Sequence, residues 1–234
     1  MLQGRFAAAY DAVRRAIAEH RAFGLQSELT QCLELARALA PLLADPGAQR
    51  RYTEELAGVF DRMIGDAGAA AATRFELALL DRRGGAPSIE DHLAGLEGGP
   101  VRDVARRRML RVAAVADCGS APKAVAAGFS AFEENTAALV AFGLCAWRVR
   151  ELDLARRSFE RATQRWSSLT TNQCSPYHAV LARFHLAGVL AEQGERAAAR
   201  AAYEAFLRCW SDPDRPVQEV AIARQMLEGS ALAP

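Results

Sequence analysis

The sequence almost lacks lysine: Lys123 is the single lysine among the 29 basic residues. Arginine codons are rich in G and C whereas lysine codons are not, so this imbalance indicates a GC-rich bacterial genome. The basic residues are matched by 28 acidic ones, which leaves a formal net charge of +1. A dedicated nucleic-acid-binding protein normally carries an excess of positive charge. The charge balance therefore gives no support to nucleic acid as a partner, without excluding it.

Cysteines are few, and no two of them stand in a C-x-x-C pair. An odd number at scattered positions argues against a disulfide framework and against a structural zinc site. We expect most of them to be small buried side chains, and we expect no metal or cofactor. The five are Cys32, Cys118, Cys145, Cys174 and Cys209.

The amino-terminal stretch lacks a long apolar run. Charged residues, among them Arg5, Asp11 and Arg14, interrupt its first twenty positions. No signal-peptide core or membrane span fits such a pattern. We therefore expect a cytoplasmic protein that has no membrane partner.

Strand signals are also missing, because no convincing run of alternating apolar and polar residues is flanked by hairpin turns. In contrast, 50 of the 234 residues are alanine, which favours helices and lets them approach closely. The sequence therefore predicts an all-α fold.

Recognised catalytic and nucleotide-binding motifs are absent, including G-x-x-x-x-G-K-[ST], H-E-x-x-H and G-x-S-x-G. Ser120 and Lys123 have the S-x-x-K spacing of an activated serine, but Pro122 between them is typical of a helix start. Cys174 and His178 could form a nucleophile and base or bind a metal, but no third group is identifiable. We expect no catalytic residue and predict that the protein is not an enzyme.

Apolar residues recur at helical spacing along the chain, and glycines and prolines divide the pattern into segments. The first helix is expected to end near residue 23, and the next to begin behind Ser27 as its cap. Ser88 and Asp91 have the spacing of a capping box. The strongest break, at residues 97–100, predicts two parts: helical hairpins in residues 1–97 and a repeat array in residues 98–234. A capping helix is expected over residues 216–229.

Two segments 44 positions apart, residues 151–166 and 195–210, repeat one another. Each is preceded by another helical stripe, so the repeating unit is a pair of antiparallel helices. Such a pair cannot bury both of its faces alone and must stack on its neighbours. The matching pairs are Glu151 and Glu195, Ala155 and Ala199, Arg156 and Arg200, Phe159 and Tyr203, Glu160 and Glu204, and Trp166 and Trp210.

The repeat resembles the tetratricopeptide repeat, a helix-turn-helix unit of about 34 residues. In the second copy, Leu186-Ala187 stands at the Leu-Gly position of that motif, and Gly194 stands at its turn. The spacing is longer than in the family, and the first copy has Arg150 at the turn. The resemblance covers residues 136–212 and implies an α-solenoid of stacked antiparallel hairpins with about ten to twelve helices. Residues 1–97 could be further degenerate repeats.

Proteins of this kind bind a partner segment on the concave side of the array, so the resemblance implies a scaffold for protein–protein interaction. An adaptor, an assembly factor or a regulatory subunit would fit. The groove positions are mostly apolar here, which suits a hydrophobic or amphipathic helix. Alternatively, these residues could pack against the amino-terminal helices. The expected groove residues are Val140, Leu144, Trp147, Arg148, Phe184, His185 and Glu192.

A second interpretation rests on the densest basic cluster, which could attract anions if it lies on an exposed helix face. The protein would then be a regulatory or sensor module for a small ligand or a nucleic acid. Asp103 interrupts the cluster, and no aromatic residues alternate with its arginines to stack on bases. The anion patch consists of Arg102, Arg106, Arg107 and Arg111, beside Arg108.

Overall fold

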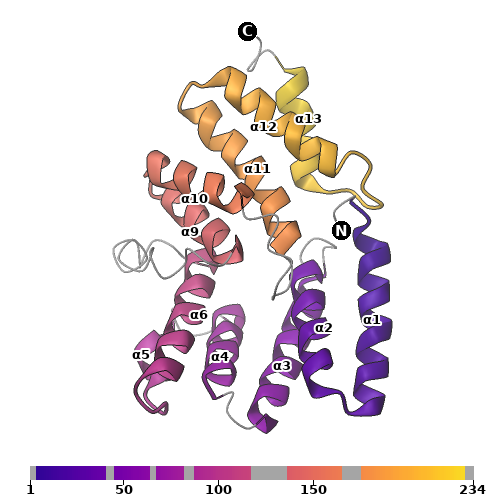
Figure 1. Ribbon diagram of the computed structural model, residues 1–234, viewed down its shortest axis with the longest axis vertical. Helices are drawn as coiled ribbons and strands as arrows, with labels where there is room; N and C mark the ends of the chain where they lie inside the picture. Colours follow the sequence, from indigo (N-terminus) through magenta and orange to yellow (C-terminus); the bar gives the residue numbers. More distant parts are fainter. Residues whose placement is uncertain are drawn as a thin grey trace. The chain divides into compact units, whose positions relative to one another are not determined.

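The computed structural model describes residues 4–40, 45–63, 67–81, 87–116, 136–164 and 175–229. Within these ranges the chain forms eleven α-helices and no β-strand, which confirms the all-α prediction (Figure 1). The helices are α1 (Phe6–Phe23), α2 (Gln26–Leu39), α3 (Pro46–Arg62), α4 (Ala67–Asp81), α5 (Ile89–Leu93), α6 (Pro100–Ala116), α9 (Thr136–Arg148), α10 (Leu152–Gln164), α11 (Ser175–Glu192), α12 (Arg196–Cys209) and α13 (Gln218–Glu228).

The helices belong to two compact units. Unit 2 consists of Ala8–Ala116, and unit 1 consists of Met1–Ala7 together with Asp117–Pro234. This division differs from the predicted boundary at residues 97–98, because α6 packs against α4 and α5 and so belongs to unit 2. The start of α1 is also grouped with the carboxyl-terminal residues rather than with its own helix.

Unit 2 is built by consecutive helices that pack on their neighbours, α2 on α3, α3 on α4, and α4 on α5 and α6. Its core has two parts, one around Leu33, Leu56 and Val59 and the other around Phe75 and Met109, and all five side chains are buried. Burying side chains of this size contributes about 1.5 to 3 kcal/mol each. Unit 2 therefore has a hydrophobic core of its own.

Two helix starts in unit 2 are capped by side chains. Asp45 accepts a hydrogen bond from the backbone N–H of Ala48 at 2.9 Å, and Ser88 accepts one from that of Asp91 at 3.3 Å, as its spacing predicts. The expected cap at Ser27 is wrong, because α2 begins at Gln26, so that Ser27 lies inside the helix and Leu25 occupies the capping position.

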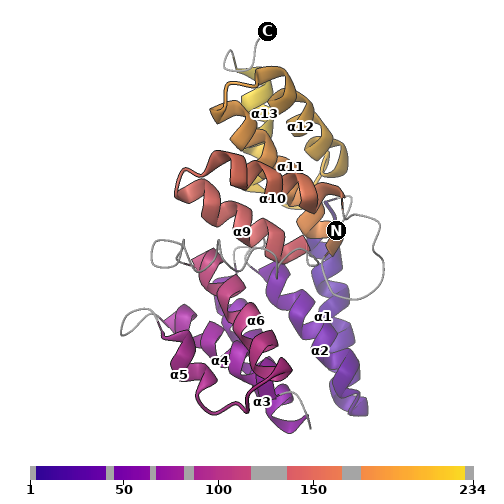
Figure 2. The same ribbon diagram turned by 60° about the vertical axis from the view of Figure 1, so that its left-hand side comes forward.

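In unit 1, α9 packs on α10, α10 on α11, α11 on α12 and α12 on α13. Helix α9 also packs directly on α11, so the first helices of the two repeated pairs are neighbours (Figure 2). A helix, α13, lies where the capping helix was expected and is shorter than the predicted range of residues 216–229, while its role as a cap stays a prediction.

The turn between α11 and α12 is formed by Gly194 in the left-handed conformation, with φ of 82°. The N–H of Gly194 donates to the carbonyl of Ala191 at 3.1 Å, and the N–H of Glu195 donates to the carbonyl of Leu190 at 2.9 Å. These bonds satisfy carbonyl groups that the end of a helix would otherwise leave unpaired. The turn therefore ends α11 and starts α12 within three residues.

The turn between α9 and α10 has the same geometry at positions 44 residues earlier. Arg150 adopts φ of 67°, although it is not glycine. Its N–H donates to Trp147 at 3.0 Å, and the N–H of Glu151 donates to Ala146 at 2.9 Å. The left-handed region costs a side-chain-bearing residue about 1 to 2 kcal/mol. The hairpin thus keeps its turn despite the sequence difference.

The repeated sequence positions also lie in equivalent surroundings. At each copy, three positions at intervals of four and three residues are buried on the second helix. Arg156 bonds Glu160 at 2.8 Å, and Arg200 bonds Glu204 at 3.1 Å. Trp166 lies outside the described residues, so its equivalence to Trp210 stays a prediction. The shared buried positions are Ala155, Phe159 and Ala162 in α10 and Ala199, Tyr203 and Phe206 in α12, and α10 also buries Ser158.

The hairpin of α1 and α2 in unit 2 has the same local design. Gly24 adopts φ of 69°, its N–H donates to Arg21 at 3.4 Å, and the N–H of Leu25 donates to His20 at 2.9 Å. On α2 the buried positions again follow at four and three residues, as Leu29, Leu33 and Ala36. This third occurrence was not detected in the sequence, because none of its buried residues except alanine matches the other copies.

The cysteines depart from the prediction at one position. Cys32 and Cys209 are free, and burial raises the pKa of the Cys32 thiol, which disfavours a reactive thiolate. Cys145, however, is disulfide-bonded, so the expectation of no disulfide is wrong for this residue. Cys118 and Cys174 lie outside the described residues.

Candidate protein-binding surface

The first helices α9 and α11 meet through an aromatic cluster around Trp147. Its ring makes edge-to-face contacts with Phe159, at a centroid distance of 6.4 Å, and with His185, at 6.2 Å. His185 in turn stacks on Phe159 at 5.4 Å and makes an edge contact with Phe184 at 5.3 Å. Each such pair contributes about 0.5 to 1.5 kcal/mol beyond area burial. The cluster therefore joins the two hairpins of unit 1.

Two glycines make room for these rings. A Cβ atom added to Gly143 would lie 2.8 Å from Cζ of Phe159, and one added to Gly188 would lie 2.9 Å from Cζ2 of Trp147. Real Cβ atoms do not approach carbon atoms so closely. The rings can pack against the helix backbones only because both positions lack a side chain. The rings that need these two glycines were not predictable from the sequence.

His185 lies inside this cluster and has no hydrogen-bond partner for its buried Nδ1 among the described residues. Burial, with a smaller contribution from the nearby Arg148 guanidinium, lowers the pKa of His185 to about 4. The imidazole is therefore neutral at physiological pH. A neutral imidazole that stacks on Phe159 and meets the edges of Trp147 and Phe184 packs as an aromatic side chain, which is a structural role.

The edge of the cluster carries charge. The indole N–H of Trp147 donates to Oε1 of Glu192 at 2.9 Å, and the other carboxylate oxygen pairs with Arg150. Arg156 of α10 forms a second link between hairpins, to Glu195 at 2.5 Å. Both links join residues of one hairpin to the next. Both links lie near the turns of the two hairpins and hold the hairpins together there.

The predicted groove residues fall into two groups. Val140 is 3% exposed and Phe184 is 9% exposed, so these two lie in the interior and do not line an open surface. Val140 belongs to the core that α9 shares with α11, and the ring of Phe184 packs on Tyr203 and Phe206 of α12. The other five are at least partly exposed: Leu144, Trp147, Arg148, His185 and Glu192.

Three of these five, Leu144, Arg148 and Glu192, belong to one helical stripe that both hairpins share. Leu144 and Arg148 in α9 are equivalent to Gly188 and Glu192 in α11, because each pair is 44 residues apart. Leu181, one turn before His185, is also partly exposed. We call Leu144, Arg148, Leu181, Gly188 and Glu192 the shared stripe. It combines leucine side chains with one cationic and one anionic group.

The arginines of the predicted anion patch lie on α6, where two of them are paired. Glu90 of α5 lies 3.0 Å from Arg106 and 3.7 Å from Arg102. Arg107 is exposed, and the side chain of Arg111 lies outside the described part. Surface pairs of this kind are weak, but they reduce the positive potential available to an anion.

The candidate catalytic residues that the sequence offered lie mostly outside the described residues. Ser120, Lys123 and Cys174 lie outside the described residues, so the pairing of Cys174 with His178 stays untested. Among the residues that the structure describes, no group of three or more His, Cys, Asp or Glu side chains could hold a metal ion. No helix in the described ranges has the length and apolar character needed to cross a membrane.

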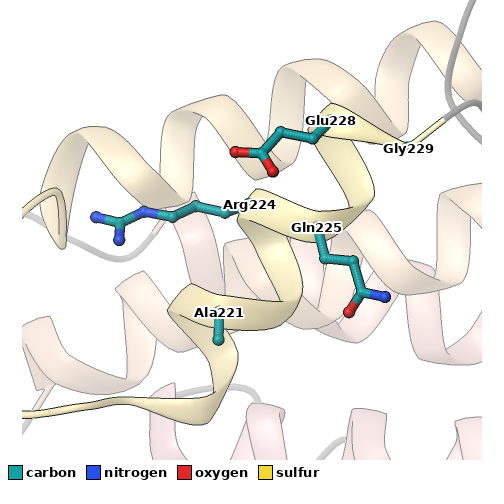
Figure 3. A pocket seen from close by; sticks show the side chains of 5 residues that line it. All are labelled: Ala221, Arg224, Gln225, Glu228 and Gly229. Carbon is teal, nitrogen blue, oxygen red and sulfur yellow. The ribbon is translucent and has the colours of Figure 1, made fainter.

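A separate open pocket lies on α13. Its lining is formed by one side of that helix, and Figure 3 shows the side chains of Arg224, Gln225 and Glu228 projecting from the helix. Ala221 and Gly229 complete the lining. Arg224 also donates to the carbonyl of Ser211 at 2.6 Å. A site made by one helix alone holds no converging groups, so it is a poor candidate for a ligand.

Comparison of the chain with protein-family models, with curated proteins and with solved structures finds no match. The function must therefore be inferred from the residues and their geometry.

Proposed function

We propose that the protein is a non-catalytic protein–protein interaction module, in which an array of hairpins similar to tetratricopeptide repeats binds a helical segment of a partner. The observation that carries the proposal is the recurrence of one hairpin at a spacing of 44 residues. Both copies have a left-handed residue at the turn, the same backbone hydrogen bonds and the same buried positions. Stacked hairpins of this type expose aligned faces of their first helices, which suit extended partners.

The shared stripe is the surface that we assign to the partner. Leu144 and Leu181 provide apolar contacts on adjacent helices, and Arg148 and Glu192 provide charges of opposite sign at equivalent positions. An amphipathic helix with apolar residues at i, i+3 and i+4 and with charges of both signs at its edges matches this pattern. Phe184 is buried beneath this surface, and the partly exposed Trp147 lies beside it.

The alternative, a regulatory or sensor module that binds an anion through α6, has less support. Glu90 already neutralises part of that patch, and the overall charge is nearly balanced. Binding to DNA or RNA that falls steeply with salt concentration would favour this alternative.

The test is affinity purification from the source organism with three forms of the full chain. The Leu144→Glu, Arg148→Glu double variant changes two residues of the shared stripe and retains every ring of the aromatic cluster, which Leu144 and Arg148 border. The Arg157→Glu variant changes an exposed arginine of α10 and serves as the matched charge control. We expect one partner to be recovered with the wild type and the control and lost with the double variant. Equal recovery with all three would contradict the assignment of this surface.

The partner should then be purified and its affinity measured by calorimetry. Loss of a well-packed apolar contact together with a charge reversal should weaken binding about 100-fold or more. Circular dichroism must show that the variants remain helical, since an unfolded variant would lose every partner.

A further inference from the structure

The amino-terminal residues 4–7 dock on the carboxyl-terminal helices as a peptide ligand would. Phe6 is fully buried, and its ring meets the ring of Trp210 edge to face at a centroid distance of 4.8 Å. Trp210 also stacks on Tyr177 at 5.6 Å and contacts Phe206 at 5.1 Å. We call Tyr177, Phe206 and Trp210 the Trp210 cluster. Phe6, which comes from the opposite end of the chain, adds a further ring to this cluster.

The backbone around Phe6 is held by the segment that joins α12 to α13. The N–H of Asp214 donates to the carbonyl of Gly4 at 3.0 Å, and the carboxylate of Asp214 accepts from the N–H of Ala7 at 3.0 Å. A carboxylate that receives the first N–H groups of a helix acts as its cap. Here the cap of α1 comes from a residue that is 207 positions away.

Gly4 is required by this arrangement. It adopts φ of 78°, and a Cβ atom at this position would lie 2.9 Å from the backbone Cα of Pro213. Because backbone cannot give way as the end of a side chain can, any larger residue would push the segment off its support. The docked sequence therefore has two specific features, a glycine and a phenylalanine two residues later.

The Trp210 cluster also has a bonding group that the docked segment does not use. The indole Nε1 of Trp210 is buried and has no hydrogen-bond partner among the described residues. Buried indole N–H groups normally find an acceptor. The docked segment therefore contributes ring packing and backbone hydrogen bonds, but no acceptor for this indole.

We propose that the Trp210 cluster is a docking site for a helix-start segment with the sequence pattern Gly-x-Phe. The chain's own residues 4–7 fill it intramolecularly, and the same segment of a second copy of the chain fills it in an exchanged dimer. This inference is independent of the shared stripe. Exchange of a terminal element between identical chains needs no new interface, because the contacts are the same in both states.

The test uses a fluorescent peptide that corresponds to residues 1–14 and the full-length Phe6→Ala variant, in which the site is vacated. We expect the peptide to bind this variant and to bind the wild type about tenfold or more weakly, since the tethered segment competes at an effective concentration of about 1 mM. A matched peptide with Gly4→Ala should lose about tenfold or more in affinity for the variant because of the clash with Pro213. Fluorescence anisotropy measures both.

Failure of the peptide to bind a folded Phe6→Ala variant, or equal binding of the two peptides, would overturn the proposal. If Phe6→Ala does not fold, the same titration is made on full-length Gly4→Ala, which retains every side chain of the Trp210 cluster. Absence of peptide binding there would equally overturn it. Sedimentation of the wild type at increasing concentration should show a dimer that the peptide converts to monomer. A partner other than a second copy would bind without changing that equilibrium.

Discussion

Replacement of Gly188 by alanine tests whether the hairpins of unit 1 are joined by the Trp147 ring. Alanine is normally better than glycine in a helix interior by about 1 kcal/mol. At Gly188, however, the new methyl group would lie 2.9 Å from Cζ2 of Trp147 and nearer still to its Cη2 atom. The ring must therefore move.

The cost can be worked out from the contacts of Trp147. A displaced ring loses its edge contacts with Phe159 and His185 and its hydrogen bond to Glu192. Two aromatic contacts at about 1 kcal/mol each and one hydrogen bond at about 1 kcal/mol exceed the gain in helix propensity. We expect Gly188→Ala to lower the free energy of unfolding by about 2 kcal/mol, because the gain of about 1 kcal/mol in helix propensity offsets part of the roughly 3 kcal/mol of lost contacts.

Two other glycine-to-alanine substitutions serve as comparisons for this change in the free energy of unfolding. At Gly143 the obstructing ring belongs to Phe159, which is fully buried and cannot move outward, so Gly143→Ala should cost more than Gly188→Ala. At Gly58 of α3 the nearest atom is the end of the Arg62 side chain at 3.5 Å. Gly58→Ala should therefore stabilise the protein by up to about 1 kcal/mol.

The assay is urea denaturation followed by circular dichroism, with thermal melting as a second measure. A change of 1 kcal/mol corresponds to about 2 to 4 °C in Tm for a chain of this length. The indole N–H resonance of Trp147 should also shift in Gly188→Ala and stay unchanged in Gly58→Ala. If Gly188→Ala proved as stable as Gly58→Ala, with that resonance unmoved, the assigned packing of Trp147 would be refuted.

Three other predictions concern the turn, the buried histidine and the arginine patch. Arg150→Gly should raise the free energy of unfolding by about 0.5 kcal/mol, because relief of the left-handed conformation exceeds the loss of a surface ion pair. Gly194→Ala should lower the free energy of unfolding by about 1 kcal/mol, and the same denaturation assay measures both. The folded-state pKa of His185, about 4, lies below its ordinary value of 6.5. The unfolded chain therefore binds the proton first, and stability should decrease as the pH falls from about 6.5 to 4, by up to about 3 kcal/mol. His185→Phe should flatten that part of the stability profile, and an unchanged profile would contradict the burial. Glu90→Gln should release Arg102 and Arg106 from their partner and delay elution from heparin, whereas an unchanged elution salt concentration would show that the pairs do not limit anion binding.

The sequence was sufficient to predict helices and the repeat because both depend on local spacing. Apolar residues at helical intervals and the glycines at helix ends indicated α1, and the copied positions Ala155 and Ala199 are both buried. The third hairpin escaped detection, since Leu29 and Leu33 preserve burial but not residue type. Repeat detection from one sequence requires similar residues, whereas packing requires only similar positions.

The candidate surface was predicted less well, because exposure depends on which helices are neighbours. Val140 and Phe184 carry the same periodic signal as Leu144, but Val140 is buried in the core shared with α11 and Phe184 is buried against α12. The pairing of Glu90 with Arg106 joins residues 16 positions apart, and the capping of Ala7 by Asp214 joins residues 207 positions apart. No periodic pattern reports such long-range pairs.

The exposed side of α13 affects whether molecules can associate end to end through this helix. Helix α13 buries Val220 and Ala223, while Arg224, Gln225 and Glu228 stand on its exposed side (Figure 3). A stack of helices can grow by end-to-end polymerisation if its last member presents an apolar face. On the proposed stacked arrangement, the charged and amide side chains of α13 would oppose association through this face, and loss of Arg224 and Glu228 would weaken that opposition.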